Sequence, residues 1–163
     1  MRKFIFLSIV EKLQQEIPEI KHFDLWNNQL AYIEGEQPFD LPAVFVEFRP
    51  IRWQHQGNSV REAAVEVVLH VLTKRIEPTS QELPYNKESL QFFDLLTDIN
   101  SALRQHSKTS YNFGHDSLTS IQSDTDNNSG EIRHDIEVFS CHTVDASAMP
   151  NYQKTTATIK VNT

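Results

Sequence analysis

Glycine is scarce in this chain, with only four among 163 residues, at positions 35, 57, 114 and 130. A dinucleotide-binding fingerprint or a phosphate-binding loop needs several closely spaced glycines, so neither motif is present. The sequence G-x-S-x-G, which marks the nucleophile elbow of many hydrolases, is missing as well. These absences exclude the glycine-dependent nucleotide-binding and hydrolase motifs.

Cysteine occurs once, as Cys141, so the chain cannot form an internal disulfide. Cys141 lies in a stretch whose alternating apolar pattern predicts a strand. A thiol in that position is a poor candidate for a nucleophile. We therefore expect a buried free thiol in a protein of a reducing compartment.

Long apolar runs and an excess of basic residues are also missing. No apolar run reaches the roughly 20 residues that span a bilayer, which argues against an integral membrane protein. Arg2 and Lys3 precede a short apolar run, but Glu11 and Lys12 end it and no small-residue cleavage site follows, so we interpret this stretch as a helix of the mature protein. The formal net charge of −7 argues against a general nucleic-acid-binding protein.

The residues that are present indicate one α+β domain spanning 1–163. Hydrophobic residues make up 39% of the chain and charged residues 23%, as in globular proteins. Residues 62–73 predict the central strand, because an apolar and a mixed face alternate with a period of two. The apolar face consists of Val65, Val67, Leu69 and Val71, and the mixed face of Glu66, Val68, His70 and Leu72.

An antiparallel-rich mixed sheet is expected, because further alternating stretches accompany the central strand. These strands are predicted at about 42–49, 116–123 and 131–143. The cluster 124–130 is interpreted as a hairpin turn. Its alternating Asp124, Asp126 and Asn128 resemble an EF-hand calcium loop, but Gly130 falls at position seven instead of six and strands flank the loop.

Two helices are expected to pack against this sheet. Apolar side chains at spacings of three and four residues predict helices over about 3–16 and 88–105. Pro18 ends the first helix, and Asn86 is the expected N-cap of the second. Residues 146–163 are predicted to form a C-terminal arm or a further edge strand.

The stretch 20–42 is predicted to form a hairpin-like connection between the first helix and the sheet. Asn27-Asn28 favours a turn, after which a short strand is expected over 30–33. Trp26 and Phe39 are interpreted as apolar side chains that pack at the sheet edge and not as residues that stack on a ligand.

Candidate catalytic and metal-binding residues are few, and we predict no catalytic residue, no cofactor and no metal. His134 and His142 share one face of a predicted strand, and His70 lies on a second strand, which raises the hypothesis of a metal site. Because no two of these residues are closely spaced in the sequence, half-exposed strand histidines are the favoured interpretation.

Four carboxylates of the predicted strands could converge as an acid pair. They are Glu47, Glu66, Asp135 and Glu137. We favour the alternative that they are solvated or paired across strands with arginines. The available arginines are Arg49, Arg52, Arg61 and Arg133.

The order of the predicted elements resembles that of the small tail terminator (tail-completion) and neck proteins of tailed bacteriophages and prophages. The resemblance covers roughly residues 3–145 and rests on the N-terminal helix, the strands PAVFVEF and VEVVLHVL, the helix FFDLLTDINSALR and a final hairpin. It implies a structural subunit, not an enzyme, that assembles into a homo-oligomeric ring, commonly six-fold, without a cofactor.

The same resemblance implies partners and a location. The ring would terminate the tail tube and join it to head-connector proteins, and DNA would pass through its channel without specific binding. The subunit would be a virion component assembled in the bacterial host cytoplasm, without contact to a membrane. The protruding loops 54–61 and 74–87 would contact neighbouring subunits.

Eight residues of these loops and of the loop aromatics are the predicted subunit or partner interface. They are Arg52, Trp53, His55, Gln56, Arg75, Tyr85, Tyr111 and Phe113. Packing at the sheet edge is the alternative role for the aromatic members.

A small-molecule-binding or catalytic α+β domain is the alternative function, with a pocket between the helix 88–105 and the sheet. A protein of this kind gathers polar residues in one concave site, whereas a ring subunit spreads polar and aromatic residues over opposite flanks.

Overall fold

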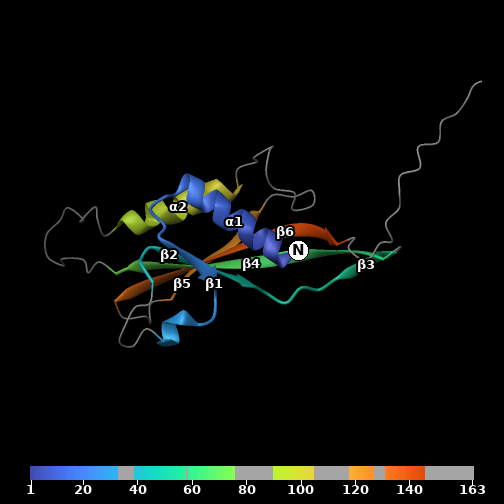
Figure 1. The fold of residues 1–163 in the computed structure, drawn as a ribbon, viewed down its shortest axis with the longest axis horizontal. Coiled ribbons are helices and arrows are strands. Elements are labelled where there is room, and N and C mark those ends of the chain that lie inside the picture. Colours follow the sequence, from blue (N-terminus) through green and yellow to red (C-terminus); the bar gives the residue numbers. More distant parts are fainter. Residues whose placement is uncertain (33–38, 58, 76–89, 105–117, 127–130, 146–163) are drawn as a thin grey trace, which may run out of the picture.

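The computed structural model of the chain describes residues 1–32, 39–57, 59–75, 90–104, 118–126 and 131–145. Helices and strands follow one another in the order shown in Figure 1. The elements are α1 (Arg2–Glu16), β1 (His22–Leu25), the 3₁₀ helix η1 (Gln29–Tyr32), β2 (Ala43–Phe48), β3 (Gln54–Gly57), β4 (Val60–Lys74), α2 (Gln91–Arg104), β5 (Thr119–Asp126) and β6 (Ile132–Asp145).

The strands form one sheet in the order β1-β2-β4-β6-β5, and β3 also pairs with β4. Only β1 and β2 run parallel, and every other pair is antiparallel. The α+β class and the antiparallel-rich mixed sheet are therefore confirmed. The predicted strands 42–49, 62–73 and 131–143 correspond to β2, β4 and β6, which lie side by side at the centre.

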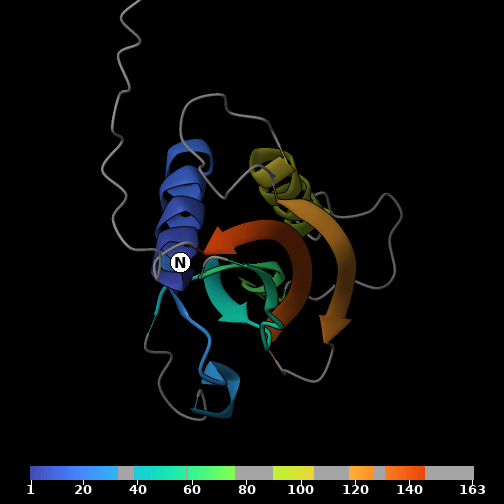
Figure 2. The ribbon, with the colours of Figure 1, turned by 90° about the vertical axis from the view of Figure 1, so that its right-hand side faces the viewer.

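Both helices lie on the same side of the sheet (Figures 1 and 2). Helix α1 buries Ile5, Ile9 and Leu13, which follow one another at four-residue spacing and so share one helix face. Helix α2 buries Leu95 and Ile99 against the same core. The sheet contributes the apolar face predicted for β4 together with Val44, Val46, Phe139 and Cys141.

A second, smaller apolar cluster lies on the other face of the sheet. It joins Phe39, Ala43, Phe45, Leu72 and Ile132, with Trp26, Leu30 and Leu41 packed against it. The segment of β1 and η1 supplies part of this cover, as Figure 2 shows below the sheet. The alternation of β2 and β4 therefore buries both sheet faces, as expected for central strands.

The predicted strand over 30–33 is wrong. The chain instead adds β1 parallel to β2, turns at Asn28, whose φ is 55°, and enters η1. The Gln29 side chain braces this turn, because its Oε1 accepts from Asn27 N at 2.8 Å and its Nε2 donates to Leu25 O at 2.7 Å. These local bonds favour a tight helical turn over a returning strand.

The strand predicted at 116–123 lies three residues further on, as β5 (Thr119–Asp126). Antiparallel pairing with β6 carries the strand into the polar residues, where Asp124 lies opposite Ile136 and Asp126 opposite His134. Edge position explains this extension, because polar side chains on an edge strand remain in contact with water. The two strands pair antiparallel as predicted, but residues 124–126 of the predicted turn belong to β5, and 127–130 lie outside the described residues.

The helices begin or end close to the predicted positions. The first was predicted over 3–16 and the second over 88–105, and the structure has Arg2–Glu16 and Gln91–Arg104. Asn86 and the predicted C-terminal arm, 146–163, lie outside the described residues. No described helix has the length and apolar character needed to span a membrane.

Candidate functional site

Four predicted interface residues lie together at one end of the sheet. Arg52 and Trp53 precede β3, and His55 and Gln56 belong to it. All four residues of β3 are exposed, and this strand extends with the start of β4 beyond the helices (Figure 1). The predicted protruding hairpin is therefore present. Its tip turns through Gly57, whose φ of 85° favours glycine.

Arg61 holds the base of this projecting hairpin together. Its guanidinium carbon lies 4.3 Å from the ring centre of Trp53, a cation–π contact. Its Nε and Nη2 donate to Oδ2 of Asp145 at 3.0 and 2.8 Å. One arginine thus joins the segment before β3, strand β4 and the end of β6. Trp53 is half-buried by this packing and is not a freely exposed anchor.

The remaining predicted interface residues are not part of that end. Arg75 follows β4 at its opposite end, about 45 Å along the strand from Arg61 at roughly 3.3 Å per residue. Its backbone N donates to Glu131 O at 2.8 Å. Tyr85, Tyr111 and Phe113 lie outside the described residues.

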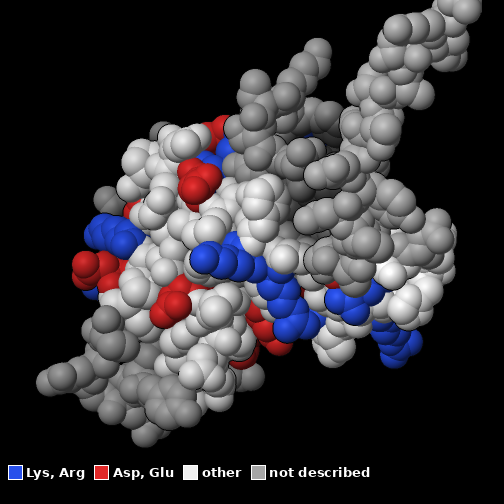
Figure 3. Space-filling model, turned by 45° about the vertical axis from the view of Figure 1, so that its right-hand side comes forward, with Lys and Arg blue, Asp and Glu red and all other residues white. Residues whose placement is uncertain are grey.

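Charged side chains of both signs lie on the face seen in Figure 3. Basic side chains run from its middle toward the right, with acidic ones beside them and to the left. Several arginines are paired with carboxylates, as in Arg49 with Glu66 at 3.0 Å and Arg133 with Asp135 at 2.8 Å. The predicted cross-strand pairing is confirmed for Glu66, whereas Asp135 pairs with an arginine of its own strand, β6.

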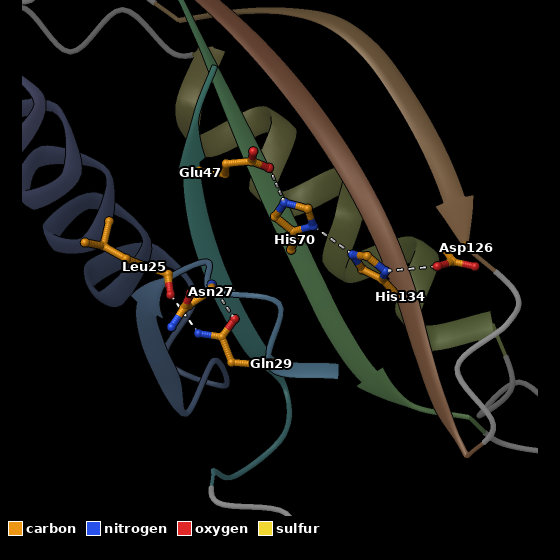
Figure 4. Close-up of polar contacts among 7 residues, drawn as sticks. All are labelled: Leu25, Asn27, Gln29, Glu47, His70, Asp126 and His134. Carbon is orange, nitrogen blue, oxygen red and sulfur yellow. Dashed lines mark hydrogen bonds and ion pairs between the residues drawn. The ribbon is translucent and has the colours of Figure 1, made fainter. Parts of the chain in front are cut away.

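Two histidines meet on the sheet face opposite the helices. His70 Nδ1 lies 2.8 Å from His134 Nε2, and the two side chains come from the neighbouring strands β4 and β6 (Figure 4). The residues are only 5% and 4% exposed. The predicted half-exposed state is therefore wrong for both, because the segment carrying Trp26 covers them. It holds for His142, whose side chain is 38% exposed.

Carboxylates flank this histidine pair on both sides. His70 Nε2 lies 3.0 Å from Glu47 Oε2 on β2, and His134 Nδ1 lies 3.7 Å from Asp126 Oδ2 on β5. A chain of four polar side chains thus crosses the sheet from β2 to β5 (Figure 4). Both outer carboxylates are partly exposed, whereas the two imidazoles are buried.

Trp26 lies over the histidine pair as a lid. Its ring stacks on His70 with 3.9 Å between ring centres and 7° between planes, and on His134 with 5.3 Å and 22°. Its backbone N donates to Val46 O at 3.0 Å, which anchors it to the sheet. Trp26 therefore packs on the sheet face, and its predicted place at the sheet edge is wrong.

The number of hydrogens on the two imidazoles limits which hydrogen bonds the four side chains can form. Two neutral imidazoles carry two N–H groups, but the four side chains make three polar contacts with one another. If His70 donates to Glu47 and accepts from His134, Nδ1 of His134 carries no hydrogen, and among the described residues this buried atom has no hydrogen-bond partner. One added proton would supply the third hydrogen, directed at Asp126.

Burial opposes that added proton. Desolvation is the largest influence and lowers the pKa of His70 below 6.5, and the charge of His134 lowers it further, against the opposing effect of Glu47. Desolvation likewise lowers the pKa of His134, against Asp126 and Asp135. The pair is therefore neutral at pH 7. Among the described residues, no group of three or more His, Cys, Asp or Glu side chains is arranged to hold a metal ion.

A hollow of about 740 Å³ lies between α2 and the β5–β6 hairpin. Its polar side chains include Asn100 of α2, Ser123 and Thr125 of β5, and Arg133, Asp135 and Glu137 of β6. The place matches the pocket that the alternative function predicts between this helix and the sheet. The polar lining residues of α2 were not singled out in the sequence, although Thr97, Asn100, Ser101 and Arg104 recur at spacings of three and four residues and so share one face of the helix.

Three arrangements of side chains are thus candidates for function: the projecting hairpin, the covered histidine pair and the hollow beside α2. The histidine pair comes from strands that are distant in sequence and adjacent in the sheet, whereas the projecting hairpin and the β5–β6 side of the hollow consist of consecutive strands. Comparison with known proteins adds no assignment, since no family model matches the chain and no curated protein matches it.

Proposed function

We propose that this chain is a structural ring subunit of a phage-like particle, which terminates the tail tube and joins it to the head. The observation that supports this best is the projecting hairpin, because a ring needs a rigid body and an extension that reaches the next subunit. The hairpin carries four of the predicted interface residues, and Arg75 lies at the other end of β4. Interface residues at opposite ends of one strand suit contacts to two neighbours.

The base of the hairpin offers a surface on which a neighbouring subunit can dock. A shallow hollow of about 650 Å³ is lined there by charged side chains of both signs. These are Arg49, Arg52, Glu62 and Glu66, and His142 also lines the hollow. Complementary charges fix the register of an interface more than they add affinity, which suits a ring whose subunits must close at one angle.

The partners that follow from this proposal are further copies of the chain, tail-tube subunits on one side of the ring and head-connector proteins on the other. A six-fold ring is expected, with DNA passing through its channel. The net charge of −7 suits this role, because like charge opposes adhesion of DNA to the channel. Assembly takes place in the bacterial cytoplasm, and the subunit becomes part of the virion.

Mass photometry and negative-stain microscopy of the purified chain test the ring. We expect a discrete closed oligomer that the charge reversal Arg52→Glu disrupts. Lys3→Glu is the matched control, because Lys3 is exposed, belongs to α1 and does not line the hollow at the hairpin. A chain that remains monomeric at high concentration, or a ring that tolerates Arg52→Glu as well as the control, contradicts the proposal.

Binding of a small molecule is the second candidate function. The hollow between α2 and β6 favours it, because its volume lies within the range of about 300–1,000 Å³ usual for ligand sites. It also gathers three ionisable side chains of one strand, Arg133, Asp135 and Glu137, at one concave place.

A further inference from the structure

The hollow beside α2 contains two buried carboxylates in different electrostatic states. Asp135 is 1% exposed and is neutralised by Arg133, whose Nε and Nη2 donate to its two oxygens at 2.8 and 3.0 Å. Thr125 Oγ1 donates to the same carboxylate at 2.7 Å. The guanidinium of Arg133 lies 3.5 Å from the ring centre of Phe92, which fixes it against α2. This ion pair is complete within the protein.

Glu137 is buried without such a partner among the residues that the structure describes. It is 3% exposed, and its Oε2 accepts from Asn100 Nδ2 at 3.0 Å and from Ser123 Oγ at 2.7 Å, both neutral donors. Among the described side chains, none of the Lys, Arg or His residues forms an ion pair with it. Burying a carboxylate without a cation is costly, and neutral hydrogen bonds offset only part of that cost.

The surroundings of Glu137 fit a cation with an apolar part. The hollow is lined by two arginines and three carboxylates, so its formal charge is negative by one. Phe93 and Leu96 also line it, and Phe93 is 53% exposed, an unusual state for a phenylalanine. Asn100 is held in place by its second bond, Nδ2 to Leu96 O at 3.0 Å.

We propose that the hollow between α2 and the β5–β6 hairpin binds a small organic cation, an alkylammonium or alkylguanidinium, with Glu137 as its counter-ion. The charged head pairs with the Glu137 carboxylate, and the alkyl part packs on Phe93 and Leu96. The bound head supplies the cation that the buried carboxylate lacks, and the contact is stronger than in water because the site is desolvated. The inference does not depend on ring assembly.

Titration of the full chain with n-butylammonium and n-butylguanidinium, followed by NMR chemical shifts, tests this proposal. We expect saturable binding with a dissociation constant on the order of 1 mM, as suits so small a ligand. Shifts should centre on Asn100, Ser123 and Glu137. The neutral analogue 1-butanol should produce no saturable shift of these signals.

Glu137→Gln is the decisive variant. Its amide oxygen still accepts from Asn100 and Ser123, so the fold is retained, but affinity for the cations should fall about tenfold or more. Its melting temperature should not fall, because a buried charge is removed. A lower melting temperature with unchanged binding would instead assign Glu137 a structural role only.

Two further variants complete the test. Glu131→Gln is the matched control, since it removes the same charge from an exposed residue that does not line the hollow, and it should bind as the wild type does. Phe93→Ala should weaken binding of the butyl cations more than of methylammonium, without disturbing folding, because Phe93 is exposed. Absence of saturable binding at about 10 mM ligand, or equal binding by Glu137→Gln, overturns the proposal.

Discussion

His70 Nδ1 lies 2.8 Å from His134 Nε2 beneath the ring of Trp26, so two imidazoles share one hydrogen in a place that water does not reach. Pairing lowers the cost of burying the two imidazoles, because each gives the other a hydrogen-bond partner for one ring nitrogen. The pair, its two carboxylates and its indole cover therefore behave as one unit, and acid should affect them together.

Stability should fall on acidification because of this unit. Burial lowers the pKa of both histidines below the unfolded value of 6.5, so the unfolded chain binds more protons than the folded chain below that pH. The free energy of unfolding should be level above pH 6.5 and decrease as the pH falls through 6.5 toward the folded pKa values. Urea unfolding between about pH 8 and pH 5 measures this slope.

The double variant His70→Gln/His134→Gln is the comparison for that measurement. It removes both titrating groups, so its slope between the same pH values should be smaller than that of the wild type. The carboxylates that act on the pair, Glu47, Asp126 and Asp135, remain in the variant. An unchanged slope would show that other groups cause the acid sensitivity.

Replacing Trp26 with alanine should destabilise the protein by about 2–4 kcal/mol, since it removes a large packed ring and uncovers the histidines. Access of water should also raise the pKa of His70 and His134 toward 6.5. Chemical denaturation gives the first quantity and NMR titration of the imidazoles the second. If the Trp26→Ala variant titrates as the wild type does, the ring does not control their solvation.

Trp53 and Arg61 should show a positive coupling energy in a double-mutant cycle. Their cation–π contact at a partly exposed site is worth about 0.5–1 kcal/mol. The variants Trp53→Ala, Arg61→Ala and their combination, compared by urea unfolding, measure the coupling. Arg61→Lys should lose most of it, because an ammonium group cannot stack as the planar guanidinium does. Additive single effects would show that the contact is not formed in solution.

Cys141 should resist thiol reagents in the native state. Its side chain is 2% exposed and belongs to the main core beneath the helices. Reaction requires the thiolate and access of the reagent, and burial in apolar surroundings restricts both. Labelling with a chromogenic disulfide should proceed fully in denaturant and more slowly by about two orders of magnitude or more without it. Rapid native labelling would contradict the packing of β6 described above.

The central part of the fold was predictable because its signals are local. Alternation of apolar residues over 62–73 identified β4 and the face that it buries, and three- and four-residue spacings identified both helices. The turn at Asn28 was predicted, but the 3₁₀ helix that follows it was not, since this helix depends on the bonds made by Gln29 and on the sheet beneath it. Its polar residues carry no period that separates a short strand from a helical turn.

The candidate sites were predictable only in part. His70 and His134 were recognised as members of strand faces, but their pairing depends on the register, in which Leu72 and not His70 lies directly opposite His134. Register is a relation between two strands, so it cannot be read from either strand alone. The place of the hollow beside α2 was predicted, but its two buried carboxylates differ only because Arg133 contacts Asp135 and not Glu137.

The amino-acid sequence by itself determined which residues alternate, which spacings make helices and which chemical groups are available, because these depend on covalent order and backbone periodicity. Tertiary structure decided that Trp26 covers two histidines, that Arg61 joins three segments and that, within the described part of the chain, Glu137 is buried with neutral donors only. The physical reason is that burial and pairing depend on distances between segments far apart in the chain, and packing alone sets those distances.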